Sequence, residues 1–238
     1  SKYFYPKYIF VSSKKDYLLT KKKWINSQVL RLHSWDGSQF IKFKKKNSIR
    51  KKKVATYLSA FSLKSSSDSA HYNTKRLENS FKVLKSINTF FNNLEKNFSF
   101  KINIAKHPRE EDNFDSPIYK NKKRFASKYL TTKLVYESKL VITTMSTAIS
   151  FAALFSKPIL FIITNEHYKN ISLIKYTNYI SNYFKSDLIN IDSEKDFKIN
   201  LNLSNYTLRK YKSFKKDYLI NEKFKNISNG QLLIKLLK

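Results

Sequence analysis

The sequence predicts an α/β fold in which helices cover both faces of a parallel sheet, and three observations support this. Short apolar segments with the length of buried strands recur along the chain. Segments with helical periodicity separate them, so that strands and helices alternate. Hydrophobic residues make up 41% of the 238 residues, which is enough to build a core and excludes a disordered chain.

The predicted strands are rich in apolar, β-branched and aromatic residues, and polar or proline-containing segments bound them. In chain order they are Tyr8–Ser12, Gln28–His33, Val54–Phe61, Phe100–Ala105, Leu140–Thr143, Pro158–Ile163 and Leu188–Ile191. The strand at Phe100–Ala105 ends before His107-Pro108, because the residue before a proline is restricted to extended backbone.

The longest predicted helix is Asn73–Phe98, where apolar residues three or four positions apart form one face. That face consists of Leu77, Phe81, Leu84, Ile87, Phe91, Leu94 and Phe98. Shorter helices are predicted at Thr132–Ser138, Thr147–Phe155 and Tyr168–Phe184, and the tail to Lys238 has a helical, basic pattern. We interpret Glu110–Arg124 as a polar loop.

The stretch Leu140–Thr164 is nearly long enough to cross a bilayer and contains a single charge, Lys157. Hydroxyl residues interrupt its start and Pro158 interrupts its end, so we predict a buried strand, turn, helix and strand instead. No signal peptide is apparent in residues 1–20, and we therefore expect a cytoplasmic protein.

A change in composition divides the predicted domains. Lys42–Lys53 is dominated by charge and has no apolar period, which indicates a linker. We therefore expect residues 1–53 to be the end of an N-terminal domain plus this linker. Residues 54–238 would form a domain of parallel strands with a helical tail.

The net charge of +30 has two interpretations. A polyanionic partner, such as nucleic acid or an anionic membrane, would favour such a charge. Drift towards Lys, Asn, Ile, Phe and Tyr would also produce it, and the spread of basic residues along the whole chain favours drift. The densest runs are Lys21–Lys23, Lys44–Lys46 and Arg50–Lys53. Aromatic residues do not interleave with them as a stacking platform for bases would, so we expect no specific nucleic-acid partner but a possible peripheral contact with anionic lipid.

Two residue types are informative through their scarcity. Cysteine is absent, which excludes disulfides, thiolate metal sites and a cysteine nucleophile. Gly37 and Gly230 are the only glycines, so no glycine-rich phosphate loop or dinucleotide motif can be written. The histidines have no metal-ligand spacing. We expect neither a metal nor another cofactor, and any phosphate site must use helix termini, hydroxyl groups or cationic side chains.

Two segments after predicted strands have residues suited to bind an anion. Lys106-His107-Pro108-Arg109 follows the strand Phe100–Ala105, and His107 and Arg109 offer imidazole and guanidinium donors. Thr144-Met145-Ser146-Thr147 follows Leu140–Thr143, where Ser146 is placed to cap the next helix. A surface loop and a simple helix cap are the structural alternatives. Two neighbouring strand ends would bring His107 and the Ser146 turn to one sheet edge, where they could hold a phosphate together.

The acidic residues near these segments are weaker candidates. Glu110-Glu111-Asp112 is interpreted as a solvated acidic run. Glu166-His167 follows another strand end, but a structural role is the stronger interpretation for this pair.

The segments IAKHPRE and TTKLVYESKLVITTMSTAISFAALFSKPILFI resemble the C-terminal domain of bacterial GT-B-type glycosyltransferases of capsule and lipopolysaccharide synthesis, including sialyltransferase and Kdo-transferase relatives. The resemblance implies a Rossmann-like fold, a nucleotide-sugar donor and a glycan or glycolipid acceptor. It also implies that His107, Ser146 and Thr147, and more loosely Arg109, bind the phosphate of the donor. It covers about residues 54–164, and Tyr8–His33 fits the end of a preceding domain.

The resemblance is incomplete at the acceptor side. Residues 1–53 are too few for an acceptor domain, which in these relatives carries the acidic general base, and Trp35-Asp36-Gly37 matches its motif poorly. We therefore leave the catalytic residues unassigned. Two other functions stay open: a nucleotide-sugar 2-epimerase-like enzyme, and a non-catalytic basic module that binds nucleic acid.

Overall fold

The computed structural model describes residues 6–44, 53–59, 80–108, 110, 116–194 and 197–237. Contacts between residues divide the chain into two compact units: residues 1–48 with 208–238, and residues 49–207. The sequence-based division at residue 53 kept the tail with the second domain, whereas contacts group the tail with the N-terminal segment. Which segments fold as independent domains stays a prediction.

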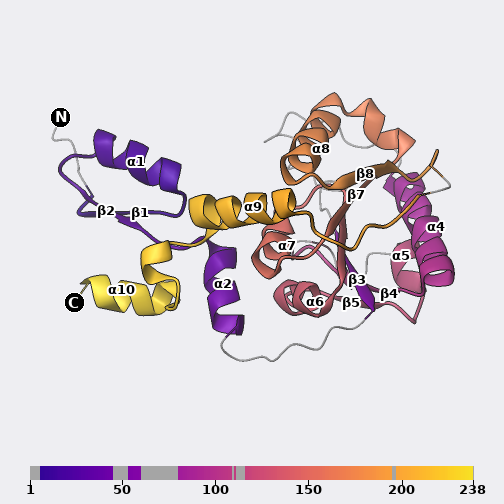
Figure 1. Cartoon of the computed structure of the whole chain (residues 1–238), viewed down its shortest axis with the longest axis horizontal. Coiled ribbons are helices and arrows are strands. Elements are labelled where there is room, and N and C mark those ends of the chain that lie inside the picture. The colour runs from indigo at the N-terminus through magenta and orange to yellow at the C-terminus, as the bar shows by residue number, and fades with distance from the viewer. Residues whose placement is uncertain are drawn as a thin grey trace. The chain divides into compact units, whose positions relative to one another are not determined.

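A parallel sheet forms the centre of the unit 49–207 (Figure 1). Across the sheet the strands are β5 (Phe125–Ser127), β4 (Lys101–Ala105), β3 (Val54–Leu58), β6 (Leu140–Thr143), β7 (Ile159–Ile163) and β8 (Asp187–Asn190). The chain moves outwards from β3 to β5, returns to β6 beside β3, and then moves outwards to β8. This is the doubly wound order, and its switch point lies between β3 and β6. The predicted α/β class with a parallel sheet is confirmed.

One face of the sheet packs against α4 (Ser80–Phe98). Alternate strand residues, among them Tyr57, Ile104 and Ile142, point to this side and join one buried cluster with the helix. The helix contributes Val83, Leu84, Ile87, Phe90, Phe91 and Leu94 to that cluster. Phe81, predicted on the apolar face, is instead 61% exposed.

The other face is also covered, because α6 (Thr131–Glu137) and α7 (Ile149–Phe155) lie on the opposite side from α4 and α5 (Pro117–Lys120) (Figure 1). Thr56 marks the contact with α6, since its hydroxyl donates to the Leu134 carbonyl oxygen at 2.9 Å. Every residue of β3, β6 and β7 is buried, as expected for a parallel sheet with two covered faces.

Several predicted boundaries need correction. Residues 60–79 lie outside the described part of the chain. The predicted end of the strand Val54–Phe61 and the predicted start of the helix Asn73–Phe98 fall there. Within the predicted loop Glu110–Arg124, a short helix α5 occupies Pro117–Lys120, and β5 follows directly after Arg124. The 3-10 helix η2 (Asn165–Lys169) precedes α8 (Ile171–Phe184), whereas one helix from Tyr168 was predicted.

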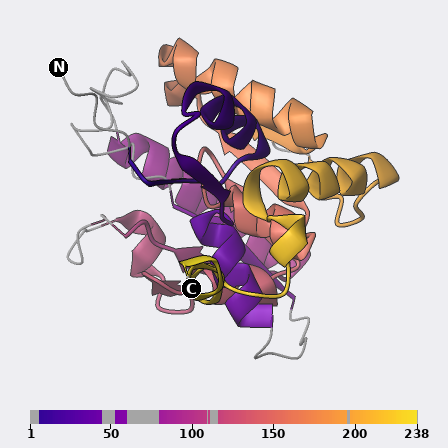
Figure 2. The same ribbon diagram turned by 90° about the vertical axis from the view of Figure 1, so that its left-hand side faces the viewer.

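The other unit brings together residues from both ends of the chain, whose elements can be followed in Figure 2. The strands β1 (Tyr8–Val11) and β2 (Gln28–Arg31) pair in parallel, as predicted, and α1 (Lys14–Lys23) connects them. The remaining helices are α2 (Trp35–Lys44), α9 (Asn205–Phe214), the π-helical turn η3 (Lys215–Leu219), the 3-10 turn η4 (Glu222–Phe224) and α10 (Asn229–Leu237). The sequence missed α1 and α2 because neither has an apolar period, and the predicted linker therefore begins inside α2.

Polar contacts attach the tail to the N-terminal segment. The ring of His33 accepts a hydrogen bond at Nδ1 from the Asn221 backbone N–H at 2.9 Å, and its Nε2 lies 2.9 Å from the Ile227 carbonyl oxygen. The Arg31 guanidinium donates to the carbonyl oxygens of Lys216 and Ile220. Burial lowers the pKa of His33, so the neutral ring is the form that fits this site.

Gly37 is the position of closest approach between these two segments. A Cβ atom there would lie 2.1 Å from the Leu219 carbonyl oxygen, which is far inside van der Waals contact. The same carbonyl accepts from the Ser34 N–H at 2.9 Å. The start of α2 therefore needs a residue without a side chain, which explains Gly37 by packing.

No helix within the described ranges is both long and apolar enough to cross a membrane. The stretch Leu140–Thr164 forms β6, α7 and β7, as the sequence predicted.

Candidate functional site

Three strand ends are aligned at the carboxyl edge of the sheet. In the register of the sheet, Leu58 of β3 pairs with Ala105 of β4 on one side and with Thr143 of β6 on the other. The segments after these strands therefore leave the sheet at the same level. Ligands of doubly wound folds bind at this edge, beside the switch point, which here lies between β3 and β6.

His107 lies in a turn at this edge. The turn closes through the Glu110 backbone N–H, which donates to the His107 carbonyl oxygen at 3.0 Å. The preceding residue is fixed by the sheet, because the Lys106 N–H donates to the Ser127 carbonyl oxygen at 2.9 Å. His107 is partly exposed. Arg109, the other predicted donor of this turn, lies outside the described residues.

Ser146 and Thr147 lie in the turn after β6. The prediction that Ser146 is the N-cap of a helix beginning at Thr147 is wrong, because α7 begins at Ile149. The chain enters the helix through short-range bonds, in which the N–H groups of Ile149 and Ser150 donate three residues back. Ser146 caps this tighter turn, since its Oγ accepts from the Ala148 N–H at 3.3 Å. Ser146 is half-buried and Thr147 is exposed.

The two turns share the sheet edge, but they do not follow adjacent strands as predicted. β3 lies between β4 and β6, which places the two strands two spacings, or about 10 Å, apart. Local sequence patterns do not encode the order of strands, which explains the error. A ligand that contacts both turns has to span the end of β3.

A buried carboxylate belongs to the residue that closes the His107 turn. Glu110 is 8% exposed, and its Oε2 accepts a hydrogen bond from the Ser59 hydroxyl at 3.1 Å. Its Oε1 accepts from the hydroxyl of Tyr119 in α5. Burial and this carboxylate raise the pKa of Tyr119, whose neutral form is the hydrogen-bond donor. The interpretation of Glu110 as part of a solvated run is wrong, because distant residues in the sequence enclose it.

Tyr57 extends the polar edge towards β6. Its side chain is buried and hydrogen-bonds to Thr144, the first residue after β6. Burial raises the pKa of Tyr57, and the nearby Glu110 carboxylate raises it further. Tyr57 therefore stays protonated at neutral pH, and its bond to Thr144 joins β3 to the segment that leads to Ser146.

Glu166 and His167 have structural roles at the end of β7. Nδ1 of His167 accepts from the Thr164 backbone N–H at 3.0 Å and closes a capping box at the start of η2. Burial lowers the pKa of His167 to about 4. Glu166 pairs with Lys82 of α4 at 3.2 Å and with Lys169 at 2.8 Å. The ion pair between Glu166 and Lys82 links the start of α4 to the segment after β7.

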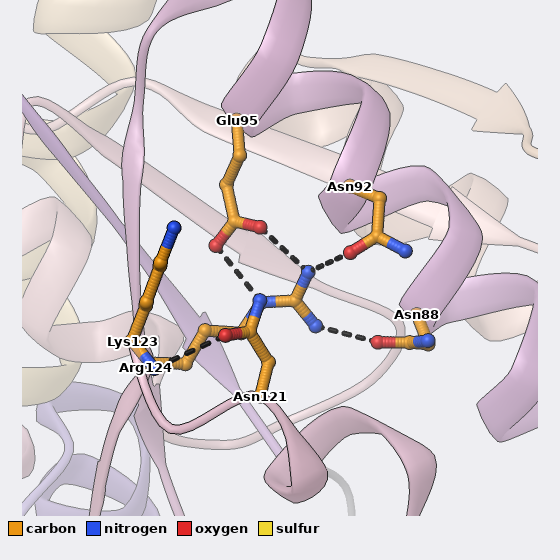
Figure 3. Close-up of polar contacts among 6 residues, drawn as sticks. All are labelled: Asn88, Asn92, Glu95, Asn121, Lys123 and Arg124. Atoms are coloured by element: carbon orange, nitrogen blue, oxygen red, sulfur yellow. Dashed lines mark hydrogen bonds and ion pairs between the residues drawn. The ribbon is translucent and has the colours of Figure 1, made fainter.

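A second polar cluster lies at the amino-terminal end of β5, where the chain meets α4 (Figure 3). Arg124 directly precedes β5, and its guanidinium points at α4. It donates to the side-chain oxygens of Asn88 and Asn92 at 2.6 and 2.5 Å. Glu95 accepts two further bonds, and the group lies 5.3 Å from the centre of the Phe91 ring. The cluster attaches the chain at the start of β5 to α4, so its role is to stabilise the fold.

In the part of the chain that the structure describes, no three His, Asp or Glu side chains form a group that could hold a metal ion.

Comparisons with known proteins add evidence on the fold. A variant of the wall teichoic acid polymerase TagF superposes with a TM-score of 0.52 at 13% identity, over 97% of this chain and 56% of that one. The UDP-GlcNAc 2-epimerase of Methanocaldococcus jannaschii, solved with UDP-GlcNAc and UDP, has a TM-score of 0.44 at 13% identity, over 97% of this chain and 60% of that one. No protein-family profile and no curated protein matches the sequence.

The superposition with TagF supports a GT-B-like fold, with the six-stranded sheet as its Rossmann-like part. The chain spans 56% and 60% of the length of these two neighbours.

Proposed function

We propose that this chain is the donor-binding half of a glycosyltransferase of bacterial surface-polysaccharide synthesis. The observation that carries the proposal is the carboxyl edge at the switch point. There the His107 turn and the Ser146–Thr147 turn flank the end of β3 at one level. The GT-B-like fold shared with a wall teichoic acid polymerase supports the same class of function.

The donor would be a nucleotide-activated sugar with its phosphate at this edge. Imidazole N–H of His107, the hydroxyl groups of Ser146 and Thr147, and the guanidinium of Arg109 are donors suited to phosphate oxygens. The two turns are separated by β3, so they would contact different parts of one ligand. A phosphate together with the adjoining ribose or sugar is long enough to bridge them, whereas a single free phosphate is too short.

The reaction follows from the chemistry of such a donor. The acceptor oxygen forms a bond to the anomeric carbon while the bond between that carbon and the phosphate oxygen breaks. The bonding electrons leave with the nucleotide phosphate, and hydrogen-bond donors at the edge stabilise the charge that develops there. The proton of the acceptor hydroxyl passes to a general base, which in the resembling enzymes belongs to the acceptor domain.

We further propose a cytoplasmic protein that contacts the inner membrane peripherally, where glycolipid acceptors are available. The basic surface supports this, because α1 carries exposed Lys14 and Lys15 at its start and Lys21–Lys23 at its end. Each basic residue near an anionic membrane surface contributes about 1 kcal/mol to the free energy of membrane binding.

Calorimetric titration of CMP, UDP and GDP tests the phosphate site. We expect one nucleotide to bind, and His107→Ala and Ser146→Ala each to weaken it. Ser146→Ala should also cost about 1 kcal/mol of stability, because the turn loses its cap. Ser172→Ala, at an exposed position of α8, is the control and should change neither property. Absence of binding by every nucleotide, or binding that ignores both site substitutions, would show that the proposal is wrong.

A further inference from the structure

The buried carboxylate of Glu110 is the polar group at the site edge whose position the proposed function does not explain. It is one of few buried acidic side chains in the described part of the chain, and its two oxygens accept from residues of different elements. Ser59 follows β3 and Tyr119 belongs to α5, so the carboxylate joins segments that lie far apart in the sequence. Burying a carboxylate without hydrogen-bond donors costs free energy, so the two hydroxyl groups indicate that the fold provides a defined site for this side chain.

We propose that Glu110 is a positioning residue that holds the His107 turn in the conformation that binds the donor phosphate. The inference rests on the proposed function, and it deepens it by naming a residue that acts through another.

The turn is fixed at both of its ends. At its start, the Lys106 N–H bonds to Ser127 of β5 and continues the sheet. At its end, the Glu110 N–H closes the turn on the His107 carbonyl oxygen, and the Glu110 side chain is held by Ser59 and Tyr119. His107 therefore projects from a short segment whose ends have little freedom. Without the carboxylate the backbone bond between Glu110 and His107 would remain, but the end of the turn would lose its side-chain bonds to Ser59 and Tyr119.

Neighbouring groups hold the partners of Glu110 in turn. The Ser59 backbone N–H donates to the Ala105 carbonyl oxygen at 3.0 Å, so Ser59 is fixed relative to β4. The Lys106 ammonium group lies 4.2 Å from the centre of the Tyr119 ring, a cation–π contact that orients the ring. The carboxylate thus connects α5, through Tyr119, with the residue that follows β3, Ser59, which is itself bonded to β4.

Substitutions of Glu110 should separate positioning from stability. Glu110→Ala removes both acceptors, so we expect the affinity for nucleotide to fall about tenfold, as for residues that orient a first contact. Glu110→Gln keeps the shape, and the Ser59 hydroxyl can turn to accept from the amide. We therefore expect Glu110→Gln to restore most of the affinity. Glu95→Gln, at the opposite edge of the sheet, is the control, since it should lower stability without changing affinity.

A double-mutant cycle tests whether Glu110 acts through His107. In the His107→Ala background, Glu110→Ala should cause no further loss of affinity, because the side chain that it positions is absent. An equal loss in both backgrounds would overturn the proposal. Unchanged affinity in Glu110→Ala would also overturn it, while leaving the proposed nucleotide site intact.

A readout without nucleotide keeps the two proposals separable. The chain has four histidines, so imidazole proton signals in NMR spectra can be assigned by single substitutions. Glu110→Ala should broaden or shift the His107 signals and leave those of His33 and His167 in place. If wild type binds no nucleotide, the proposed function is wrong and this measurement alone decides the positioning role. Unchanged His107 signals would overturn that role.

Discussion

The guanidinium of Arg124 donates two hydrogen bonds to one carboxylate, from Nε to Oε1 of Glu95 at 2.9 Å and from Nη2 to Oε2 at 2.7 Å. The Arg124 side chain is fully buried, whereas that of Glu95 is 24% exposed. A planar fork matches a carboxylate in this way, and an ammonium group cannot reproduce it. The pair attaches the chain before β5 to the C-terminal part of α4 (Figure 3).

Arg124→Ala should therefore destabilise the protein by about 3 kcal/mol, because it leaves a carboxylate and two amides without their partner. Arg124→Lys should cost less, since the charge stays although the fork is lost. Urea denaturation followed by circular dichroism measures both. Arg209→Ala, at an exposed position of α9, is the control and should fall within about 0.5 kcal/mol of wild type. Equal effects at the two arginines would contradict a structural role for the pair.

Gly37→Ala should destabilise the unit that joins the two ends of the chain, because the new Cβ would overlap the Leu219 carbonyl oxygen. The clash is with backbone, so no side chain can move aside, and overpacking of this kind costs about 1–3 kcal/mol or more. Gly230→Ala is a matched control, since nothing lies within 4 Å of a Cβ there. Thermal unfolding compares the two. A stable Gly37→Ala variant would show that the tail does not pack against α2 in this way.

His167 should make the protein less stable in acid. Its pKa is lowered from 6.5 to about 4 by burial, so the unfolded chain binds a proton that the folded chain excludes. The stabilisation is complete above about pH 6.5 and is lost progressively as the pH falls towards about 4, by roughly 3 kcal/mol. Denaturation of wild type and His167→Gln at pH 7.5 and pH 4.5 measures it. The pH dependence should be shallower in the variant, and identical slopes would contradict the prediction.

Binding to anionic lipid should depend on the basic end of α1. Wild type should sediment with phosphatidylserine-containing vesicles at low salt and be released at high salt, because the attraction is screened. Replacing Lys21, Lys22 and Lys23 with Gln should reduce binding. The same replacement at the exposed residues Lys122, Lys123 and Lys133 of the other unit is the control. Sedimentation that ignores salt would argue against an electrostatic contact.

The segment from β6 to β7 shows what the sequence could predict about the fold. Its strands are continuous apolar runs and a proline marks where β7 begins, so the local pattern was sufficient. By contrast, β5 has only the three residues Phe125–Ser127, of which one is aromatic. It forms because β4 pairs with it and Arg124 attaches the preceding residue to α4. Short strands of this kind depend on tertiary contacts that no local pattern contains.

The candidate site was also predictable only where local sequence patterns determine it. His107 and Ser146 could be placed at strand ends because a proline and hydroxyl residues follow apolar runs. The position of β3 between their two strands follows from the order of strands in the sheet, which no local pattern contains. The burial of Glu110 depends on Ser59, which lies 51 positions earlier in the chain. Its charge alone favoured a solvated position, and only the fold supplies the two hydroxyl donors.

The grouping of residues 1–48 with 208–238 has a consequence for how the protein is made. A ribosome releases the chain from its N-terminus, so the whole of residues 49–207 emerges before the tail that Arg31 and His33 bind. The sheet from β3 to β8 can form during translation, because all of its strands are then available. The segment from β1 to β2 must therefore wait for residues 208–238, and during that interval β1, α1 and β2 lack their C-terminal partner.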